Sequence, residues 1–117
     1  MSIYDEIQAE RDRQDAKWGK PSLPSVDDCL MHRPGGCTPQ RMAEEYEIPS
    51  ATRAKFICLT NAHWSKSTWT DIAVEELAEA VEAATEGDYD NLRVELIQTT
   101  AVLVQWIEDL DRGGGRA

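Results

Sequence analysis

The sequence predicts an all-α protein, in which four helices form a bundle and an irregular insert follows the first helix. No segment alternates apolar and polar residues for long enough to form a strand. Two long segments in the second half of the chain instead carry apolar residues at helical spacing. Proline and glycine, which interrupt helices, are concentrated between residues 19 and 48.

The first predicted helix covers residues 2–17, with acidic side chains in its first turn, where they stabilise a helix. Glu10 and Gln14 share the face that carries the apolar Ile3 and Ile7. A purely structural helix would place Leu or Ala at those two polar positions. We therefore expect this face to do more than pack.

Residues 19–48 are predicted to form a long loop with one short helix near residues 41–46. Loops of this length usually act as lids or contact partners. Within the insert, Cys29, His32 and Cys37 are closely spaced but lack a convincing fourth metal ligand. We therefore expect reduced thiols rather than a structural zinc site.

Three further helices are predicted near residues 50–63, 70–87 and 88–111. Gly87 suits the left-handed residue that ends a helix, and Asp88 suits the cap that begins the next one. Because only a short turn joins them, the last two helices must run antiparallel. The apolar arc of the third helix consists of Ala73, Val74, Leu77, Ala80, Val81 and Ala84.

Length and composition limit the function classes. The 117 residues fit a single domain over residues 1–112, followed by a disordered tail over residues 113–117. The net charge of −10 argues against a nucleic-acid polymer as partner and suits a protein that binds cations, although a solvated acidic surface would also explain it. No apolar run reaches the roughly 20 residues needed to span a bilayer, and no signal peptide is apparent, so we expect a cytoplasmic protein.

Two groups of glutamates lie in otherwise apolar helical segments. The first contains Glu75, Glu76 and Glu79, and the second is Glu95, the only charged residue in the run 94–107. Burying an unpaired carboxylate costs several kcal/mol. No lysine or arginine lies within that run to compensate the charge of Glu95.

The ~100° rotation per helical residue predicts where these carboxylates lie. Glu76 and Glu79 fall on a sheltered edge beside the apolar arc, whereas Glu75 falls on the side expected to be solvated. Antiparallel packing should bring Glu76 and Glu79 opposite Glu95. A glutamate pair alone is more often a solvated face, but with Glu95 the three acids predict a site for Mg²⁺ or Mn²⁺, which prefer oxygen ligands.

The pattern E-E-x-x-E, a spacer and E-x-x-D resembles the signature of the MazG-like all-α nucleoside triphosphate pyrophosphohydrolases. It is present here as residues 75–79 and 95–98. Residues 10–19 and the pair 68–69 resemble segments of phage-type members. The likeness spans most of the chain and is weakest in the insert.

This resemblance implies an enzyme that cleaves nucleoside triphosphates between the α and β phosphates, giving a nucleoside monophosphate and pyrophosphate. Glu76, Glu79 and Glu95 would hold Mg²⁺ or Mn²⁺, and Glu75 would bind metal or orient the attacking water. Gln98 stands where the family has aspartate, so its amide oxygen could bind metal but brings no charge. A related subset acts on GTP or dGTP in phages, which makes these nucleotides candidate substrates.

Family members are homodimers or homotetramers, and the apolar last helix independently favours self-association. The candidate phosphate-binding residues are Lys17, Arg53, Lys55, Lys66 and Arg93, each of which could equally be surface charge. Trp18 and Trp69 are candidate base-stacking residues, with Gln14 or Asp15 reading the base edge, and packing in the core is the alternative role for each tryptophan. Trp64 and Trp106 are expected to pack.

Two alternative functions stay open. The chain could be a non-catalytic helical dimerisation module that retains an acidic metal-binding patch. It could also be a phosphoribosyl-ATP pyrophosphatase, which shares the fold and the chemistry. Assays on the respective nucleotides would separate these alternatives.

Overall fold

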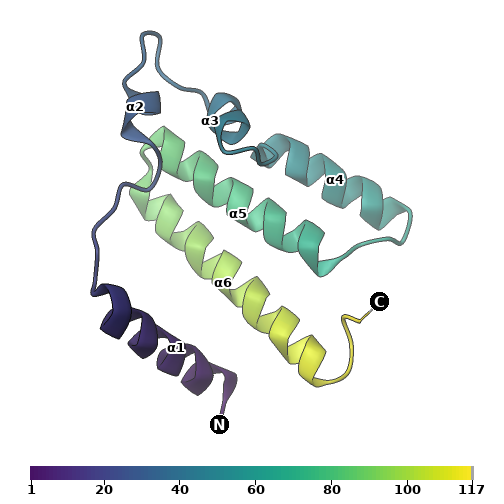
Figure 1. The fold of residues 1–117 in the computed structure, drawn as a ribbon. Coiled ribbons are helices and arrows are strands. Elements are labelled where there is room, and N and C mark those ends of the chain that lie inside the picture. Colours follow the sequence, from purple (N-terminus) through teal and green to yellow (C-terminus); the bar gives the residue numbers. More distant parts are fainter. Residues whose placement is uncertain (117) are drawn as a thin grey trace.

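The computed structural model describes residues 1–116, and within that range it contains helices and no strands (Figure 1). The helices are α1 (Ile3–Trp18), α2 (Asp28–Met31), α3 (Pro39–Glu45), α4 (Ala51–His63), α5 (Trp69–Glu86) and α6 (Tyr89–Asp111). The all-α class is confirmed. The insert contains two short helices rather than the single one expected. Helix α2 was missed because its four residues are too few to show a helical period.

Local capping explains where the long helices begin and end. The Ser2 and Thr68 hydroxyls each accept a hydrogen bond of 3.1 Å from the backbone N–H three residues later, at the starts of α1 and α5. Because Thr68 is the cap, α5 begins at Trp69, one residue earlier than expected. Gly87 has φ 72°, the left-handed conformation that ends α5, as predicted.

Helices α4, α5 and α6 lie side by side with α5 in the middle, and α1 lies along the outer side of α6 (Figure 1). The main core is at the end where α5 turns into α6. The insert covers this end, since Leu30 of α2 and Met42 of α3 are buried there against Ala80 and Ala84. The insert therefore contributes to the core, a role that the composition of residues 19–48 did not suggest.

The chain is thin and extended for its length. Its extents are 50 × 45 × 23 Å and its radius of gyration is 16.4 Å, compared with about 13 Å for a compact domain of this size. The accessible surface is 8600 Å², whereas a compact monomer of this mass exposes roughly 6,400 Å². No residue of α1 is buried. A single copy thus leaves uncovered much surface that a compact domain would bury.

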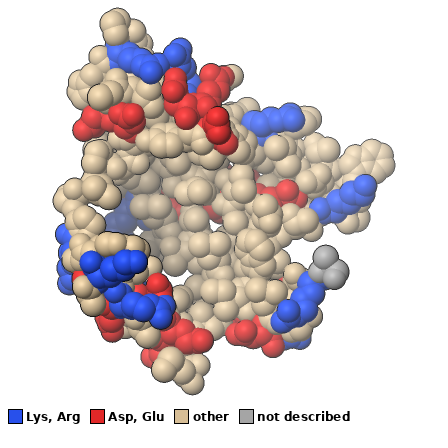
Figure 2. Space-filling view, in the orientation of Figure 1, with Lys and Arg blue, Asp and Glu red and all other residues tan. Residues whose placement is uncertain are grey.

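Apolar side chains account for part of this exposed surface. On the face shown in Figure 2, the area over α5 and α6 is mostly neither acidic nor basic, while charges gather on the insert and on α1. The large apolar side chains exposed on these two helices are Ile72, Leu77, Tyr89, Val94, Leu96, Ile97, Leu103 and Ile107.

The residues after α6 contact the end of that helix. Residues 113–116, expected to be disordered, fold back onto the last turn of α6, where the Gly113 and Gly114 amides donate to the Leu110 and Asp109 carbonyls at 3.0 and 2.9 Å. Residue 117 lies outside the described residues. Within residues 1–116, none of the helices has the length and hydropathy of a membrane-spanning segment.

Candidate metal centre

Three carboxylates converge between α5 and α6. Glu76 and Glu79 extend from α5 and Glu95 from α6, and one oxygen of each lies within 4.8 Å of the others. All three side chains are half-buried. Within residues 1–116 they are the only group of three or more His, Cys, Asp or Glu side chains close enough to share an ion. These are the three glutamates that the helical projection brought together, and we call them the triad.

The triad carries unsatisfied polar atoms. Glu76 Oε2 and Glu95 Oε2 are buried and have no hydrogen-bond partner. Leaving such an atom unpaired costs about 1–3 kcal/mol. None of the ion pairs within residues 1–116 involves a triad carboxylate. The chain itself therefore does not compensate the negative charge that it concentrates here.

Burial and mutual repulsion change how the triad titrates. Burial, a hydrogen bond with Glu95 and the charges of Glu76, Glu95 and Glu75 raise the pKa of Glu79 to about 7. Burial and the charges of Glu95 and Glu75 raise the pKa of Glu76. Without a metal, the site therefore retains protons near neutral pH that a divalent cation would displace.

The expectation that Glu75 lies on a solvated face is wrong. Helix α4 packs against that side of α5, and Glu75 is half-buried there. The Cys58 thiol of α4 donates to the Asp71 backbone carbonyl at 3.1 Å. Burial, followed by the interaction with Glu75, raises the pKa of this thiol to about 12. Asn61 Nδ2 donates to Asp71 Oδ2 at 2.9 Å on the same side. The packing of α4 against α5 therefore shelters Glu75 from solvent.

Gln98 lies one turn beyond Glu95 on α6 and is exposed. Its amide is therefore accessible from solvent rather than enclosed with the three carboxylates. A neutral amide at this edge adds no charge to the repulsion within the triad.

The predicted phosphate-binding side chains do not come together within one chain. They are exposed and lie on α1, on α4, in the loop before α5 and on α6, namely Lys17, Arg53, Lys55, Lys66 and Arg93. The Lys17 ammonium lies 4.8 Å from the centre of the Trp18 ring, and Arg53 lies over Phe56. Each of these two cations contacts an aromatic ring of its own helix.

The end of α1 forms a small recess of about 360 Å³ that includes Gln14, Asp15 and Trp18. The sequence grouped these three residues as candidates for contacting a base. Gln14 donates to Glu10 Oε1 at 3.3 Å, and Trp18 is 64% exposed. The recess is thus open, and it lies on a different helix from the triad.

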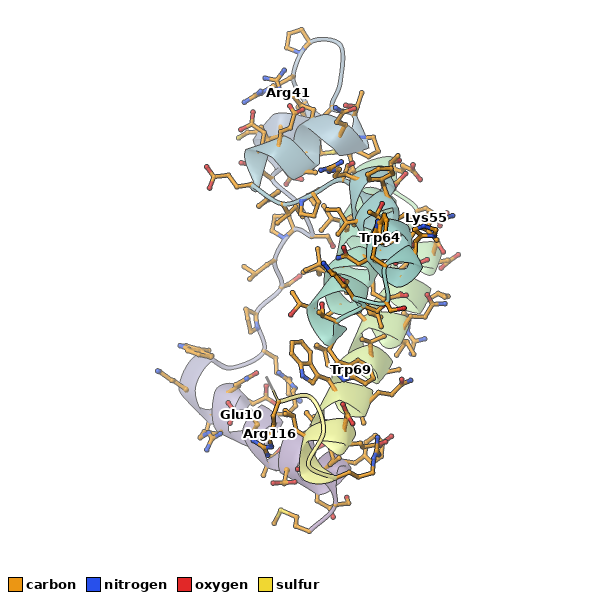
Figure 3. The ribbon with its side chains drawn as sticks, turned by 90° about the vertical axis from the view of Figure 1, so that its right-hand side faces the viewer. Glu10, Arg41, Lys55, Trp64, Trp69 and Arg116 are labelled. Carbon is orange, nitrogen blue, oxygen red and sulfur yellow. The ribbon has the colours of Figure 1, made fainter. Side chains whose placement is uncertain are left out.

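The four tryptophans differ from one another in burial. Trp69 is half-buried, and its Nε1–H donates to Asp109 Oδ2 at 2.8 Å. Trp106 is also half-buried. Trp64, expected to pack, is 66% exposed at the end of α4, where it contacts His63 edge-on, so that expectation is wrong. In Figure 3, Trp64 and Lys55 lie on α4, apart from Trp69.

Asp109 is a residue that the sequence reasoning missed. An acidic side chain in the last turn of a helix interacts unfavourably with the helix dipole. This unfavourable position could have indicated from the sequence that Asp109 has a specific partner. The structure shows that Asp109 holds the Trp69 indole.

Comparison with known proteins does not assign this chain to a family. The function is therefore inferred from the three carboxylates and the motif in which they occur. No family model matches the chain, and no curated protein or solved structure matches it.

Proposed function

We propose that this chain is a metal-dependent nucleoside triphosphate pyrophosphohydrolase of the MazG-like type. The observation that carries the proposal is the convergence of Glu76, Glu79 and Glu95 with two buried carboxylate oxygens left unpaired. The products would be a nucleoside monophosphate and pyrophosphate. GTP and dGTP are the first substrates to test.

The donor set fits Mg²⁺ or Mn²⁺. Carboxylate oxygens are the ligands that these ions prefer, and a shared position between two helices would satisfy Glu76 Oε2 and Glu95 Oε2 together. When bound, such an ion neutralises phosphate charge and lowers the pKa of water. Gln98 is our candidate for an additional, neutral ligand.

In the proposed reaction a water oxygen attacks the α phosphorus, and the bond from that phosphorus to the α–β bridging oxygen breaks. Pyrophosphate leaves with the bridging oxygen, and the water gives up its proton. Glu75 is our candidate to orient the water and accept this proton. Its charge raises the pKa of both Glu76 and Glu79, so it lies beside the triad without belonging to it.

We also propose that the working form is a homodimer or homotetramer. The excess of roughly 2,000 Å² of accessible surface over that of a compact monomer is comparable to what one subunit loses in a large obligate interface. A second copy would cover the apolar side chains of α5 and α6. It would also allow Lys17 and the other cations of one copy, and its recess lined by Gln14, Asp15 and Trp18, to approach the triad of another.

The test is pyrophosphate release from each ribo- and deoxyribonucleoside triphosphate in the presence of Mg²⁺ or Mn²⁺. We expect turnover that falls at least about 100-fold in Glu79→Gln and in Glu95→Gln. Glu108→Gln, a change of the same type on α6 away from the triad, should retain full activity. Phosphoribosyl-ATP is assayed alongside, because faster turnover of that compound would favour the phosphoribosyl-ATP pyrophosphatase alternative.

A different outcome would favour the non-catalytic alternative. If no nucleotide is hydrolysed and Mn²⁺ leaves the melting temperature unchanged, the chain is a helical dimerisation module with an acidic patch. Release of orthophosphate instead of pyrophosphate would contradict cleavage between the α and β phosphates.

A further inference from the structure

A pocket of about 520 Å³ lies at the far end of the α5/α6 pair, where α5 begins and α6 ends. Its walls are Trp69 and Ile72 of α5, Trp106 and Asp109 of α6, and Arg116 of the C-terminal segment. Figure 3 shows Trp69 and Arg116 at this end of the molecule. The volume falls within the range of about 300–1,000 Å³ that is typical of small-ligand sites.

The aromatic wall of this pocket is held in place. Asp109 accepts the Trp69 Nε1–H at 2.8 Å and also lies 3.7 Å from the Arg112 guanidinium. The chain then passes directly over the Asp109 carboxylate. A Cβ atom at position 114 would lie 2.2 Å from Asp109 Oδ1, so any larger residue would push the carboxylate or the backbone segment aside.

The returning segment also delivers a cation to the pocket. Arg116 donates to the Leu110 carbonyl at 3.3 Å, which ties residues 113–116 to the end of α6. The pocket therefore combines two indoles, one guanidinium and the hydroxyls of Ser67, Thr68 and Thr70. Such a combination suits a flat ring with a polar edge.

The position of the pocket links it to the triad. At ~100° per residue, Trp69 and Glu76 lie within about 20° of each other around α5, and Trp106 and Glu95 within about 20° around α6. Pocket and triad thus lie on the same side of the helix pair. They are separated by about 10 Å along α5 and about 16 Å along α6, which is comparable to the span from the base to the phosphates of an extended nucleotide.

We propose that this pocket binds the nucleobase of the substrate whose phosphates lie at the triad. The inference rests on the proposed function for its phosphate end, and on Trp69, Trp106 and Arg116 for its base end. The indoles stack on the ring, and stacking tolerates every base because each has a π face. Base preference then comes from the polar groups at the rim.

The first experiment examines the base end alone, without metal and without phosphates. The protein carries Trp18→Phe and Trp64→Phe, which remove the two exposed indoles. Each of the common nucleosides is added in increasing concentration, and the fluorescence of the remaining tryptophans is measured. We expect saturable quenching that persists when Glu79→Gln is added. Absence of quenching by every nucleoside would overturn the proposal.

The second experiment measures steady-state kinetics of pyrophosphate release. Trp69→Leu and Trp106→Leu should each raise KM roughly 10-fold, with kcat within about threefold of the parent value because the chemistry at the triad is intact. Trp64→Leu is the matched control and should leave KM unchanged. Asp109→Asn keeps the Trp69 ring but weakens its anchor, so it should raise KM by a smaller factor and provides a variant with minimal risk of misfolding.

The two proposals fail in different ways. If pyrophosphate is released but KM is unchanged in Trp69→Leu, Trp106→Leu and Asp109→Asn, the pocket is not the base site while the proposed function stands. If nucleosides quench fluorescence but no nucleotide is hydrolysed, the enzymatic function fails while the pocket stands as a site for aromatic rings.

Discussion

Replacing Glu95 by leucine should make the metal-free protein more stable and remove its response to Mn²⁺. The substitution removes the buried, unpaired Glu95 Oε2 and relieves the repulsion that raises the pKa of Glu76 and Glu79. An unpaired buried polar atom costs about 1–3 kcal/mol. With roughly 4 °C per kcal/mol for a domain of this size, the melting temperature in EDTA should rise by about 4–12 °C.

The rise in melting temperature caused by Mn²⁺ should be smaller in Glu95→Leu than in the parent protein. A ligand at 100 times its dissociation constant stabilises the folded state by about 2.7 kcal/mol, which corresponds to roughly 10 °C for the parent protein. Glu95→Leu removes one of three oxygen ligands and should lose most of this gain. The measurement is thermal unfolding followed by circular dichroism, in EDTA and over a series of Mn²⁺ concentrations.

Glu108→Leu is the matched control, since it makes the same change on α6 well beyond the triad. It should retain the full Mn²⁺ shift. A Glu95→Leu protein that keeps the full Mn²⁺ shift, or that melts below the parent protein in EDTA, would refute the assignment of Glu95 to a shared cation site.

Three further predictions follow from the same structure. Folding raises the pKa of Glu79 from 4.5 to about 7, so between these pH values the folded protein binds more protons than the unfolded one. The stability of the metal-free protein should therefore fall as the pH rises from about 4.5 to 7, and it should fall less in Glu79→Gln. A melting temperature in EDTA that does not change with pH in the parent protein would contradict the pKa shift. Gly114→Ala would place a Cβ atom 2.2 Å from Asp109 Oδ1, so the carboxylate or the segment over it must move. Trp69 fluorescence should therefore shift, with a loss of only about 1 kcal/mol in unfolding free energy; an unchanged emission spectrum would show that the segment does not hold Asp109. Ile97→Lys or Leu103→Lys should shift the protein toward monomer in light-scattering measurements, whereas Leu59→Lys, an exposed position on α4, serves as the comparison; equal oligomer size in all three would place the interface elsewhere.

The residues of α5 show how far sequence reasoning reaches. The helical projection correctly placed Glu76 and Glu79 on one sheltered edge, because the rotation between them depends only on backbone geometry. It gave Glu75 the wrong environment, because it could not show that α5 is the central helix and has α4 on its other side. For the same reason Leu77, in the predicted apolar arc, is 46% exposed, while the buried positions include Ala78 and Ala83.

The insert and the C-terminal segment show a second limit. Prolines and glycines correctly predicted that residues 19–48 would lack a long helix, but not that Leu30 and Met42 would be buried against α5. The glycine run at residues 113–115 suggested disorder. In the structure, the absence of a side chain at Gly114 lets the backbone pass over Asp109. Composition reports conformational freedom and gives no information about which contacts restrict it.

Periodicity and capping over a few residues were enough to predict the all-α class, the main helix ends and the turn that makes α5 and α6 antiparallel neighbours. Local spacing was also enough to place three glutamates opposite one another. Three features became visible only in the folded chain. The Trp69–Asp109 contact joins residues 40 positions apart, and Glu76 Oε2 and Glu95 Oε2 are left without partners. The thin shape leaves much apolar surface exposed. These features depend on how many neighbours each helix acquires, a quantity that no local pattern encodes.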